Sequence, residues 1–290
     1  MLGPVRATGP GVGEGVPMQR SGTPIAGSRV LVTGGGRGLG RRIALRAAAR
    51  GAAEVVVWDV DGERAEEVTA EITAHHRRAS AATVDIRDAG AVASAAVGAG
   101  DVDVVVNCAG VVTGRRLLDA DEAAIRRTFE VNTLALYWVT RAFLPGMLRR
   151  DRGTVVTIAS AAGMVGVARQ TDYSASKFAA VGFTESLRAE LRAERSHVRS
   201  LLVCPYYIDT GMFEGVRTRV PWLLPILRED DVAHAVVDGV ERGRAQIVLP
   251  PAVWLVPGLR LLGTRGFDTL MDVLGINHTM DHFVGRRPGA

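Results

Sequence analysis

Short apolar runs alternate with longer amphipathic segments along most of the chain. We expect strands in seven runs, at residues 29–33, 54–59, 82–85, 102–108, 153–159, 199–204 and 246–249. Most of these runs are apolar throughout and do not alternate, which is typical of parallel strands covered on both faces. Ala/Arg/Glu-rich stretches predict helices at 38–50, 62–76, 88–97, 121–150, 172–195 and 230–242. The alternation predicts an α/β fold with a doubly wound parallel sheet of about seven strands.

The chain is expected to divide into three parts. Residues 1–27 contain Gly, Pro, Ser and Thr without an apolar run, so we expect a flexible tail and neither a signal peptide nor a membrane anchor. Residues 28–250 hold the strands and helices, and 290 residues fit a single domain with extensions better than two cores. Residues 251–290 form an apolar C-terminal extension. With no transmembrane span expected, we predict a cytoplasmic protein.

Composition and charge exclude several function classes. Hydrophobic residues make up 47% of the chain and charged residues 23%, which predicts a well-buried core. The net charge of +4 comes from arginines scattered through every segment, so we expect no nucleic-acid binding. Cys108 and Cys204 each end an apolar run and are interpreted as reduced core thiols. The six histidines are dispersed without ligand spacing, so no metal site is expected.

A glycine-rich turn follows the first expected strand. Residues 33–40 read Thr-Gly-Gly-Gly-Arg-Gly-Leu-Gly, in the register TGxxxGxG with Gly34, Gly38 and Gly40 as its key positions. Glycines permit a tight turn and close backbone approach, and free N–H groups at the helix N-terminus face a pyrophosphate. A merely structural βα loop is the alternative interpretation. The position between the first strand and a helix favours a dinucleotide site on a Rossmann-type fold.

Asp59, at the end of the second expected strand, indicates the kind of dinucleotide. It lies about 20 residues beyond the last glycines, where a carboxylate accepts hydrogen bonds from the adenine ribose hydroxyls. The same charge would repel a 2′-phosphate. Arg37 is the contrary sign, because a basic residue in the loop helps to hold NADP. We therefore predict NAD, with NADP as the second choice.

Tyr173 and Lys177 lie four residues apart at the start of an expected helix, so they share a face. A free phenol has a pKa near 10, and a neighbouring ammonium together with an oxidised nicotinamide would lower that pKa. Ser160, at the end of the fifth strand, is placed to hold a substrate oxygen near Tyr173. A YxxxK pattern alone is common by chance, but its combination with Ser160 and the glycine turn indicates proton transfer coupled to hydride transfer.

Several motifs together resemble the short-chain dehydrogenase/reductase family over about residues 28–250. Residues 33–40 match the family's cofactor loop, and residues 84–86 resemble its adenine-contacting segment. Residues 107–110, Asn-Cys-Ala-Gly, resemble its Asn-Asn-Ala-Gly motif. Asn132 falls on the helix position that in this family supports a water-mediated proton relay to the lysine. The resemblance implies a catalytic tetrad of Asn132, Ser160, Tyr173 and Lys177.

The resemblance also implies which residues contact the cofactor. Asp85 and Ile86 are expected to flank the adenine, and Lys177 to hold the nicotinamide ribose. With the glycine loop and Asp59, the expected cofactor-binding set is Gly34, Arg37, Gly38, Leu39, Gly40, Asp59, Asp85, Ile86, Asn107, Ala109, Gly110, Tyr173, Lys177, Pro205, Ile208 and Thr210.

One departure from the family pattern follows the sixth strand. Pro205 and Thr210 are kept there, but Tyr206 stands where Gly is usual. This variant is similar to the branch that contains retinol dehydrogenases, epidermal retinal dehydrogenases and long-chain 17β-hydroxysteroid dehydrogenases. The resemblance implies an apolar alcohol or carbonyl substrate, such as a retinoid, a steroid or a fatty alcohol.

Two apolar segments lie late in the chain. Residues 211–229 are expected to form either a lid over an apolar ligand or an ordinary packed helix pair. A helix over 252–262 would reach only about 16 Å, against a hydrocarbon core of about 30 Å, so it cannot span a membrane. It is expected either to lie at a membrane surface as a peripheral contact or to cover the active site of its own or a partner subunit.

The sequence therefore predicts an NAD-dependent oxidoreductase that interconverts an apolar alcohol and its aldehyde or ketone, with Tyr173 as general acid/base. The first alternative is a non-catalytic dinucleotide-binding regulator on the same fold. The second is a sugar-nucleotide epimerase or dehydratase, which usually needs a larger C-terminal domain than the roughly 40 residues present here. By analogy with the family, helices 121–150 and 172–195 are expected to form the interface of a homodimer or homotetramer.

Overall fold

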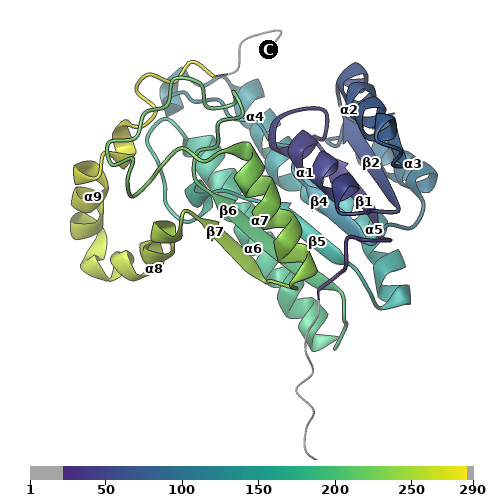
Figure 1. Ribbon diagram of the computed structural model, residues 1–290. Coiled ribbons are helices and arrows are strands. Elements are labelled where there is room, and N and C mark those ends of the chain that lie inside the picture. The colour runs from purple at the N-terminus through teal and green to yellow at the C-terminus, as the bar shows by residue number, and fades with distance from the viewer. Residues whose placement is uncertain (1–21, 286–290) are drawn as a thin grey trace, which may run out of the picture.

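The computed structural model describes residues 22–285, in which one parallel sheet is covered by helices on both faces (Figure 1). The strand order is β3-β2-β1-β4-β5-β6-β7, and every neighbouring pair is parallel. The strands are β1 Arg29–Thr33, β2 Glu54–Asp59, β3 Ala79–Thr83, β4 Val104–Asn107, β5 Thr154–Ile158, β6 Arg199–Pro205 and β7 Gln246–Leu249. The predicted doubly wound sheet is confirmed.

Alternate side chains of each central strand enter different hydrophobic layers. Val30 and Val32 pack with α1 Gly38–Ala49, α2 Gly62–Ala74 and α7 Glu229–Glu241. Leu31 packs on the opposite face, where the helices are α3 Ala89–Ala99, α5 Ala135–Arg150 and α6 Thr171–Ala193. This two-sided burial is the physical reason that the strands are apolar at every position. Figure 1 shows α1 and α7 together on one face of the sheet.

The strand order reverses between β1 and β4, which are neighbours in the sheet although two strands separate them in the chain. Their last residues, Thr33 and Asn107, lie side by side. Loops that leave the carboxyl ends of such strands in opposite directions open a crevice, and ligands of doubly wound sheets bind there.

Two elements differ most from their predicted limits. β3 begins at Ala79, whereas the sequence predicted a strand over 82–85. It is an edge strand of small residues, so it lacks the Val/Ile signal on which that prediction rested. The helix predicted at 121–150 is divided into α4 Glu122–Phe129 and α5 by a π-helical turn, Glu130–Leu134. Such turns leave no trace in hydrophobic periodicity, and they are frequent at functional sites.

Residues 22–27 pack onto the domain instead of belonging to a flexible tail. The backbone N–H groups of Gly22 and Thr23 each donate to a carbonyl oxygen in the last turn of α7, at 3.1 Å. Ile25 is fully buried and anchors this short polar segment. The predicted tail is therefore wrong for these residues, and its remainder, residues 1–21, lies outside the described residues.

The C-terminal extension folds against the carboxyl edge of the sheet. Residues 252–262 do not form a single helix, and Gly263 ends the run with φ at +68°. Instead there are short turns of helix, followed by one longer helix. In order they are the 3₁₀ turn Pro251–Leu255, α8 Val256–Leu259, the 3₁₀ turn Arg260–Leu262, α9 Gly263–Val273 and the 3₁₀ turn Ile276–His278.

Residues 211–229 also contain no helix pair. They form a run of turns that is fixed at its end by the backbone pairing of Ile208 with Leu227. Pro221 and Pro225 explain why this apolar segment does not continue as a helix. Within the described part of the chain, none of the helices combines the length and the apolar character that crossing a bilayer requires.

Candidate active site

The glycine loop lies between β1 and α1, at the reversal of strand order. Gly34 has a φ of +64°, and a Cβ on it would lie 2.7 Å from Cα of Ala109 in the segment after β4. A Cβ on Gly40 would lie 2.1 Å from the carbonyl oxygen of Gly34. The side chain of Arg37 makes no capping bond to the first turn of α1. The loop thus combines a tight turn with an uncapped helix N-terminus, which is the arrangement that binds a pyrophosphate.

Asp59 is buried at the end of β2, beside the glycine loop. Its Oδ2 accepts a hydrogen bond from the Gly36 N–H at 2.9 Å, and its Oδ1 accepts one from the Asp61 N–H at 3.1 Å. These two bonds fix the carboxylate on the wall of the large cavity that begins at the loop. Arg37, the contrary sign for NADP, lines the same cavity.

Asp85 and Ile86, which follow β3, line the same cavity, and their contact with the adenine stays a prediction. Arg87 donates to both carboxylate oxygens of Asp85, with Nε at 2.9 Å from Oδ1 and Nη2 at 2.5 Å from Oδ2. This pairing lowers the pKa of the Asp85 carboxyl. An ion pair and an apolar side chain therefore lie together on this part of the cavity wall.

The segment after β4 departs from expectation at two residues. Asn107, the last residue of β4, is turned away from the cavity, and its Nδ2 lies 3.4 Å from Oγ1 of Thr140 on α5. Its side chain is therefore not on the cavity wall, because side chains alternate at the strand end, and its expected contact with the cofactor stays a prediction. Cys108 packs against the core as expected, and it also lines the cavity with Ala109 and Gly110, which was not predicted. Burial raises the pKa of the Cys108 thiol to about 12, so the thiol is uncharged at neutral pH.

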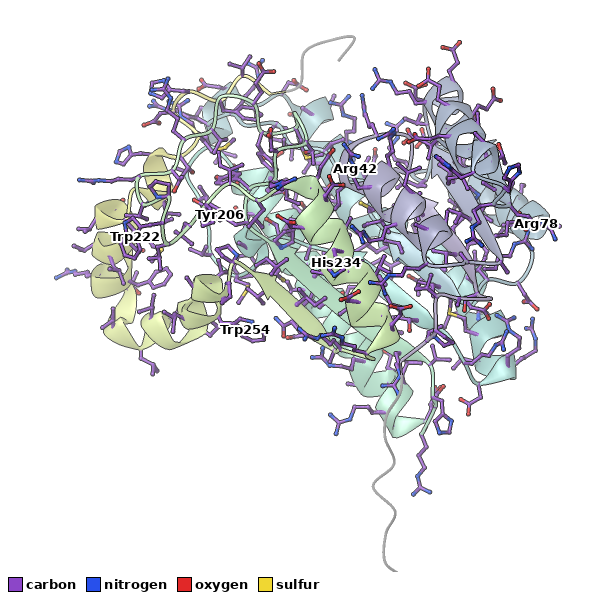
Figure 2. The ribbon with its side chains drawn as sticks, viewed as in Figure 1. Arg42, Arg78, Tyr206, Trp222, His234 and Trp254 are labelled. Atoms are coloured by element: carbon purple, nitrogen blue, oxygen red, sulfur yellow. The ribbon has the colours of Figure 1, made fainter. Side chains whose placement is uncertain are left out.

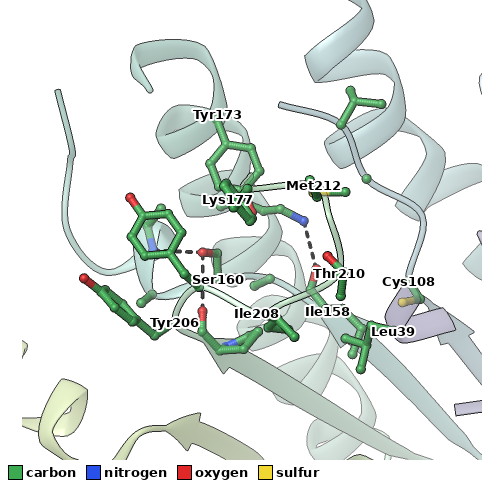
Figure 3. A pocket seen from close by; sticks show the side chains of 18 of the residues that line it. Leu39, Cys108, Ile158, Ser160, Tyr173, Lys177, Tyr206, Ile208, Thr210 and Met212 are labelled. Atoms are coloured by element: carbon green, nitrogen blue, oxygen red, sulfur yellow. Dashed lines mark hydrogen bonds between the residues drawn. The ribbon is translucent and has the colours of Figure 1, made fainter. Parts of the chain in front are cut away.

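Ser160, Tyr173 and Lys177 face one cavity from two elements, the end of β5 and the first turns of α6 (Figure 3). Lys177 Nζ donates to the carbonyl oxygen of Ile158 at 2.9 Å and lies 5.7 Å from the centre of the Tyr173 ring. Ser160 Oγ accepts a hydrogen bond from the Ala162 N–H at 3.1 Å. The phenol, the ammonium and the hydroxyl that the sequence singled out are thus brought together.

Burial dominates the electrostatics of this group. It raises the pKa of the Tyr173 phenol above its usual range, and the hydroxyl of Ser160 opposes that rise only in part. Burial also lowers the pKa of Lys177 to about 8. The protein by itself therefore keeps the phenol protonated at neutral pH, and the expected lowering of its pKa has to come from a further positive charge.

Asn132 lies in the π-helical turn and is fully buried, without a place on the cavity wall. Its Oδ1 accepts from the N–H of Val111, and its Nδ2 donates to the carbonyl oxygen of the same residue, both at 2.9 Å. Nδ2 also lies 3.0 Å from Oγ of Ser176. The side chain thereby fastens the segment after β4 to α6, and a Cβ on Gly110 would lie 3.4 Å from Asn132 Oδ1 and 3.7 Å from Lys177 Nζ.

The strand-end residues Pro205, Ile208 and Thr210 line the cavity as expected. Tyr206 lines it as well, and its ring lies 4.6 Å from the ring of Tyr207. An aromatic side chain thus occupies the wall where a glycine would leave space.

Beyond Tyr173 the cavity, whose volume is about 610 Å³, becomes apolar. Its wall comes from residues 211–229 and from the C-terminal extension, and it includes Met212, Phe213, Leu223, Leu224, Val253, Val256, Leu259, Met271, Leu274 and Ile276. The Phe213 ring meets the Tyr173 ring edge to face at 5.8 Å. The sequence left open whether residues 211–229 and 252–262 cover the active site. In the structure, residues of both segments line the cavity.

A buried hydrogen-bond chain ties the C-terminal extension to α6. Gln170 Nε2 donates to the Tyr207 hydroxyl at 3.2 Å, and that hydroxyl bonds to Oγ1 of Thr279 at 2.9 Å. Gln170 and Tyr207 line the cavity. Sequence reasoning missed all three residues, since single polar residues in separate segments carry no spacing signal.

A parallel sheet with a glycine turn at its reversal point, and a phenol, an ammonium and a serine hydroxyl around one cavity, define a dinucleotide-dependent oxidoreductase. Residues 22–285 bring together no group of three or more His, Cys, Asp or Glu side chains that is suited to a metal ion. A sequence profile described as short chain dehydrogenase matches residues 28–221. The chain belongs to this family, as the sequence motifs predicted.

Similar proteins are named as dehydrogenases or oxidoreductases. Epidermal retinol dehydrogenase 2 of Mus musculus is 37% identical over 271 residues, which cover 91% of this chain and 87% of the relative. Retinol dehydrogenase 10 of Rattus norvegicus is 34% identical, with 92% and 87% covered. A crystal structure of a short-chain dehydrogenase/reductase from Burkholderia phymatum in complex with NAD aligns with a TM-score of 0.75 and 26% identity, over 82% of this chain and 94% of that one. A metagenomic short-chain oxidoreductase in complex with NADP aligns with a TM-score of 0.65 and 31% identity, over 77% and 97%.

Proposed function

We propose that this protein interconverts an apolar alcohol and its aldehyde or ketone with NAD(H), and that Tyr173 is the general acid/base. The convergence of Ser160, Tyr173 and Lys177 on one cavity, whose far part is apolar, carries this proposal. The glycine loop supports it, because a Cβ at Gly34 or Gly40 would strike neighbouring backbone, so these glycines keep the turn tight at the N-terminus of α1, where a pyrophosphate would bind.

The roles of the residues follow from their positions. When bound, NAD supplies the acceptor for the hydride. Tyr173 removes the proton of the alcohol while Ser160 holds the oxygen, and the steps reverse in reduction. The Lys177 ammonium would hold the nicotinamide ribose, and its charge together with that of the oxidised ring would offset the burial that raises the pKa of the Tyr173 phenol. Asn132 fixes the segment beside Lys177, and a water relay from the lysine past Asn132 to solvent stays a prediction.

The preference for NAD over NADP rests on Asp59. Its carboxylate is held on the cavity wall by two backbone N–H groups, so it cannot swing aside for a 2′-phosphate without losing both bonds. The solved relatives include one complex with NAD and one with NADP, so family membership alone does not decide the preference. Arg37 lines the same cavity as this fixed negative charge, and we give the carboxylate the greater weight.

The substrate class rests on the apolar wall beyond Tyr173. Aliphatic and aromatic side chains supply that wall, and they bury a hydrocarbon while excluding water from the reacting atoms. Relatives named retinol dehydrogenases support a retinoid-like substrate, and steroid or fatty alcohols have the same apolar character.

The direct test incubates the purified protein with NAD or NADP and a panel of apolar alcohols, with NADH or NADPH fluorescence as the readout. We expect NADH to form with apolar alcohols such as retinol and a long-chain fatty alcohol, and little turnover with glycerol. The corresponding aldehydes are tested with NADH in the reverse direction. Tight NADH binding without turnover in either direction would instead indicate the non-catalytic dinucleotide-binding regulator.

Peripheral membrane contact is the second part of this proposal. Trp254, Leu261 and Leu262 are exposed and do not line the cavity, whereas Val253 and Val256 of the same segment do. Figure 2 shows Trp254 and the exposed Trp222 on the side of the molecule where α8 and α9 lie. Apolar and tryptophan side chains of this kind enter the headgroup region of a bilayer. Co-sedimentation with liposomes tests this contact, and Trp254→Ser with Leu261→Ser should abolish it while leaving turnover of a water-soluble alcohol unchanged.

Self-association stays a prediction, which the exposed apolar residues of the helices support. Leu134, Tyr137 and Phe178 are exposed at the start of α5 and on α6. A two-fold pairing of these helices would cover them. Sedimentation equilibrium of the purified protein distinguishes a monomer from the expected dimer or tetramer.

A further inference from the structure

Asp172 is a buried carboxylate directly before Tyr173, in the first turn of α6, and its side chain is not part of the cavity wall. Only 5% of the residue is exposed. Among the described residues, no Lys, Arg or His side chain forms an ion pair with it. Burying a carboxylate is costly unless hydrogen bonds satisfy its oxygens. Its partners therefore bear on what the residue does.

Two threonine hydroxyls from separate elements satisfy this carboxylate. Thr113, in the loop after β4, donates to Oδ1 at 2.8 Å, and the hydroxyl of Thr128, on α4, lies 2.9 Å from Oδ2. We call these three side chains the Asp172 clasp. The loop that carries Thr113 also carries Ala109 and Gly110, which line the cofactor part of the cavity. The clasp therefore joins the first turn of the helix that bears Tyr173 to the loop beside the nicotinamide position.

Other contacts fix neighbouring parts of this arrangement, and one of them reaches the same turn, because Ser176 Oγ donates to the carbonyl oxygen of Tyr173 at 2.7 Å. Asn132 bonds to Val111 and to Ser176, one turn further along α6. Gln170 precedes the helix, and its side chain does not cap the first turn. Asp172 directly precedes Tyr173 in the chain, and its carboxylate bonds to Thr113 in the loop after β4.

We propose that Asp172 is a positioning residue for the reaction: through Thr113 and Thr128 it sets the place of the Tyr173 phenol relative to the cofactor. This inference rests on the proposed function of Tyr173. It assigns Asp172 no proton transfer and no contact with substrate.

The hydrogen bonds of Thr128 make Asp172→Asn a control variant that should keep the clasp. Its hydroxyl has one hydrogen but two acceptors, Asp172 Oδ2 at 2.9 Å and the carbonyl oxygen of Ala124 at 3.0 Å. In Asp172→Asn, the amide can accept from Thr113 and donate to the Thr128 oxygen, while the Thr128 hydrogen goes to Ala124. The asparagine variant therefore keeps both arms of the clasp. Asp172→Ala loses both arms, and Thr113→Val loses one with little change of shape.

The test compares kcat, KM and NADH affinity of these three variants with the wild type. A displaced catalytic group loses about 10²-fold in rate for roughly 1 Å of misplacement, so we expect that loss of kcat for Asp172→Ala. We expect an intermediate loss for Thr113→Val and a return to within about threefold of wild type for Asp172→Asn, because the asparagine keeps both bonds. NADH affinity should change little in all three. Thr69→Val, which alters an exposed hydroxyl on α2, is the matched control and should leave kcat unchanged.

Amide hydrogen exchange separates this inference from the proposed function. Exchange over residues 171–177 should be faster in Asp172→Ala and unchanged in Asp172→Asn, whether or not the correct alcohol has been found. If the wild type turns over no alcohol, the proposed function fails, and exchange alone decides on the clasp. Two results would overturn the proposed role of Asp172. One is an equal loss of kcat in Asp172→Asn and Asp172→Ala, and the other is an Asp172→Ala variant whose kcat and amide exchange match the wild type. Should Asp172→Ala also lose NADH binding, Thr113→Val decides: a loss of kcat with NADH binding retained supports the clasp, and unchanged kcat refutes it.

Discussion

The cofactor part and the substrate part of the cavity are lined by different kinds of residue. Around the cofactor position, backbone and small residues approach closely, as at Gly34 and Ala109, and the polar groups are fixed by backbone N–H donors, as at Asp59. Around the substrate position, large apolar side chains such as Val256 and Met271 come from segments late in the chain. The first part depends on residue type and spacing, and the second depends only on apolar volume. Small substitutions in the cofactor part should therefore reduce cofactor affinity strongly, whereas substitutions in the substrate part should change KM for the alcohol only moderately.

The largest expected effect comes from Tyr173→Phe, which should reduce the rate of the reaction without changing the binding of cofactor or substrate. Tyr173→Phe removes only the proton-transferring hydroxyl, so turnover should fall about 10³-fold or more while NADH affinity stays nearly intact. Steady-state kinetics and NADH fluorescence titration check the two halves of this statement. Unchanged turnover would remove Tyr173 from the mechanism.

Gly40→Ala tests the cofactor part. The new Cβ would lie 2.1 Å from a backbone oxygen, so the loop must shift and NADH affinity should fall about 100-fold, or about 3 kcal/mol. Gly98→Ala on α3 is the matched control, because its Cβ would meet nothing within 4 Å. It should leave NADH affinity unchanged and stabilise the fold by about 0.5 kcal/mol, as measured by thermal unfolding. Similar NADH affinities in the two variants would refute the close approach.

Asp59→Ala tests the choice of dinucleotide. Loss of a charge-assisted hydrogen bond to the ribose should reduce the preference for NAD over NADP by about 10- to 100-fold in kcat/KM. Asp88→Ala, which removes the exposed cap of α3, should cost about 1 kcal/mol of stability and leave the preference unchanged. A preference for NADP in the wild type would contradict the role given to Asp59.

The smallest effect is expected in the substrate part. Val256→Phe adds volume to the apolar wall, so KM for a bulky alcohol should rise about tenfold and KM for a small alcohol should change less. NADH affinity should be unaffected. Val97→Phe makes the same change on an exposed face of α3 and is the control. A loss of NADH affinity in Val256→Phe would show that the two parts are not independent.

The same contrast explains how far the sequence could be read. The strands β1, β2 and β7 were predicted residue by residue, and most residues of the expected cofactor-binding set line the cavity, because glycine spacing and buried strands leave distinct patterns. β3 was displaced, because an edge strand of small residues lacks such a pattern. The direction of the Asn107 side chain, away from the cavity, was not predicted, because a motif does not state which way the last strand residue points. Neither the π-helical turn at Asn132 nor the Gln170–Tyr207–Thr279 chain was foreseen, since both depend on contacts between distant segments.

The central claim is that a phenol, an ammonium and a serine hydroxyl act together beside the nicotinamide. A crystal structure of the protein with NAD and an apolar alcohol analogue tests it most directly. We predict the ligand oxygen within about 2.6–3.2 Å of both Tyr173 Oη and Ser160 Oγ, with the pyrophosphate at Gly34–Gly40. A ligand oxygen bound away from Tyr173, or a nicotinamide outside the cavity that these three residues line, would contradict the account.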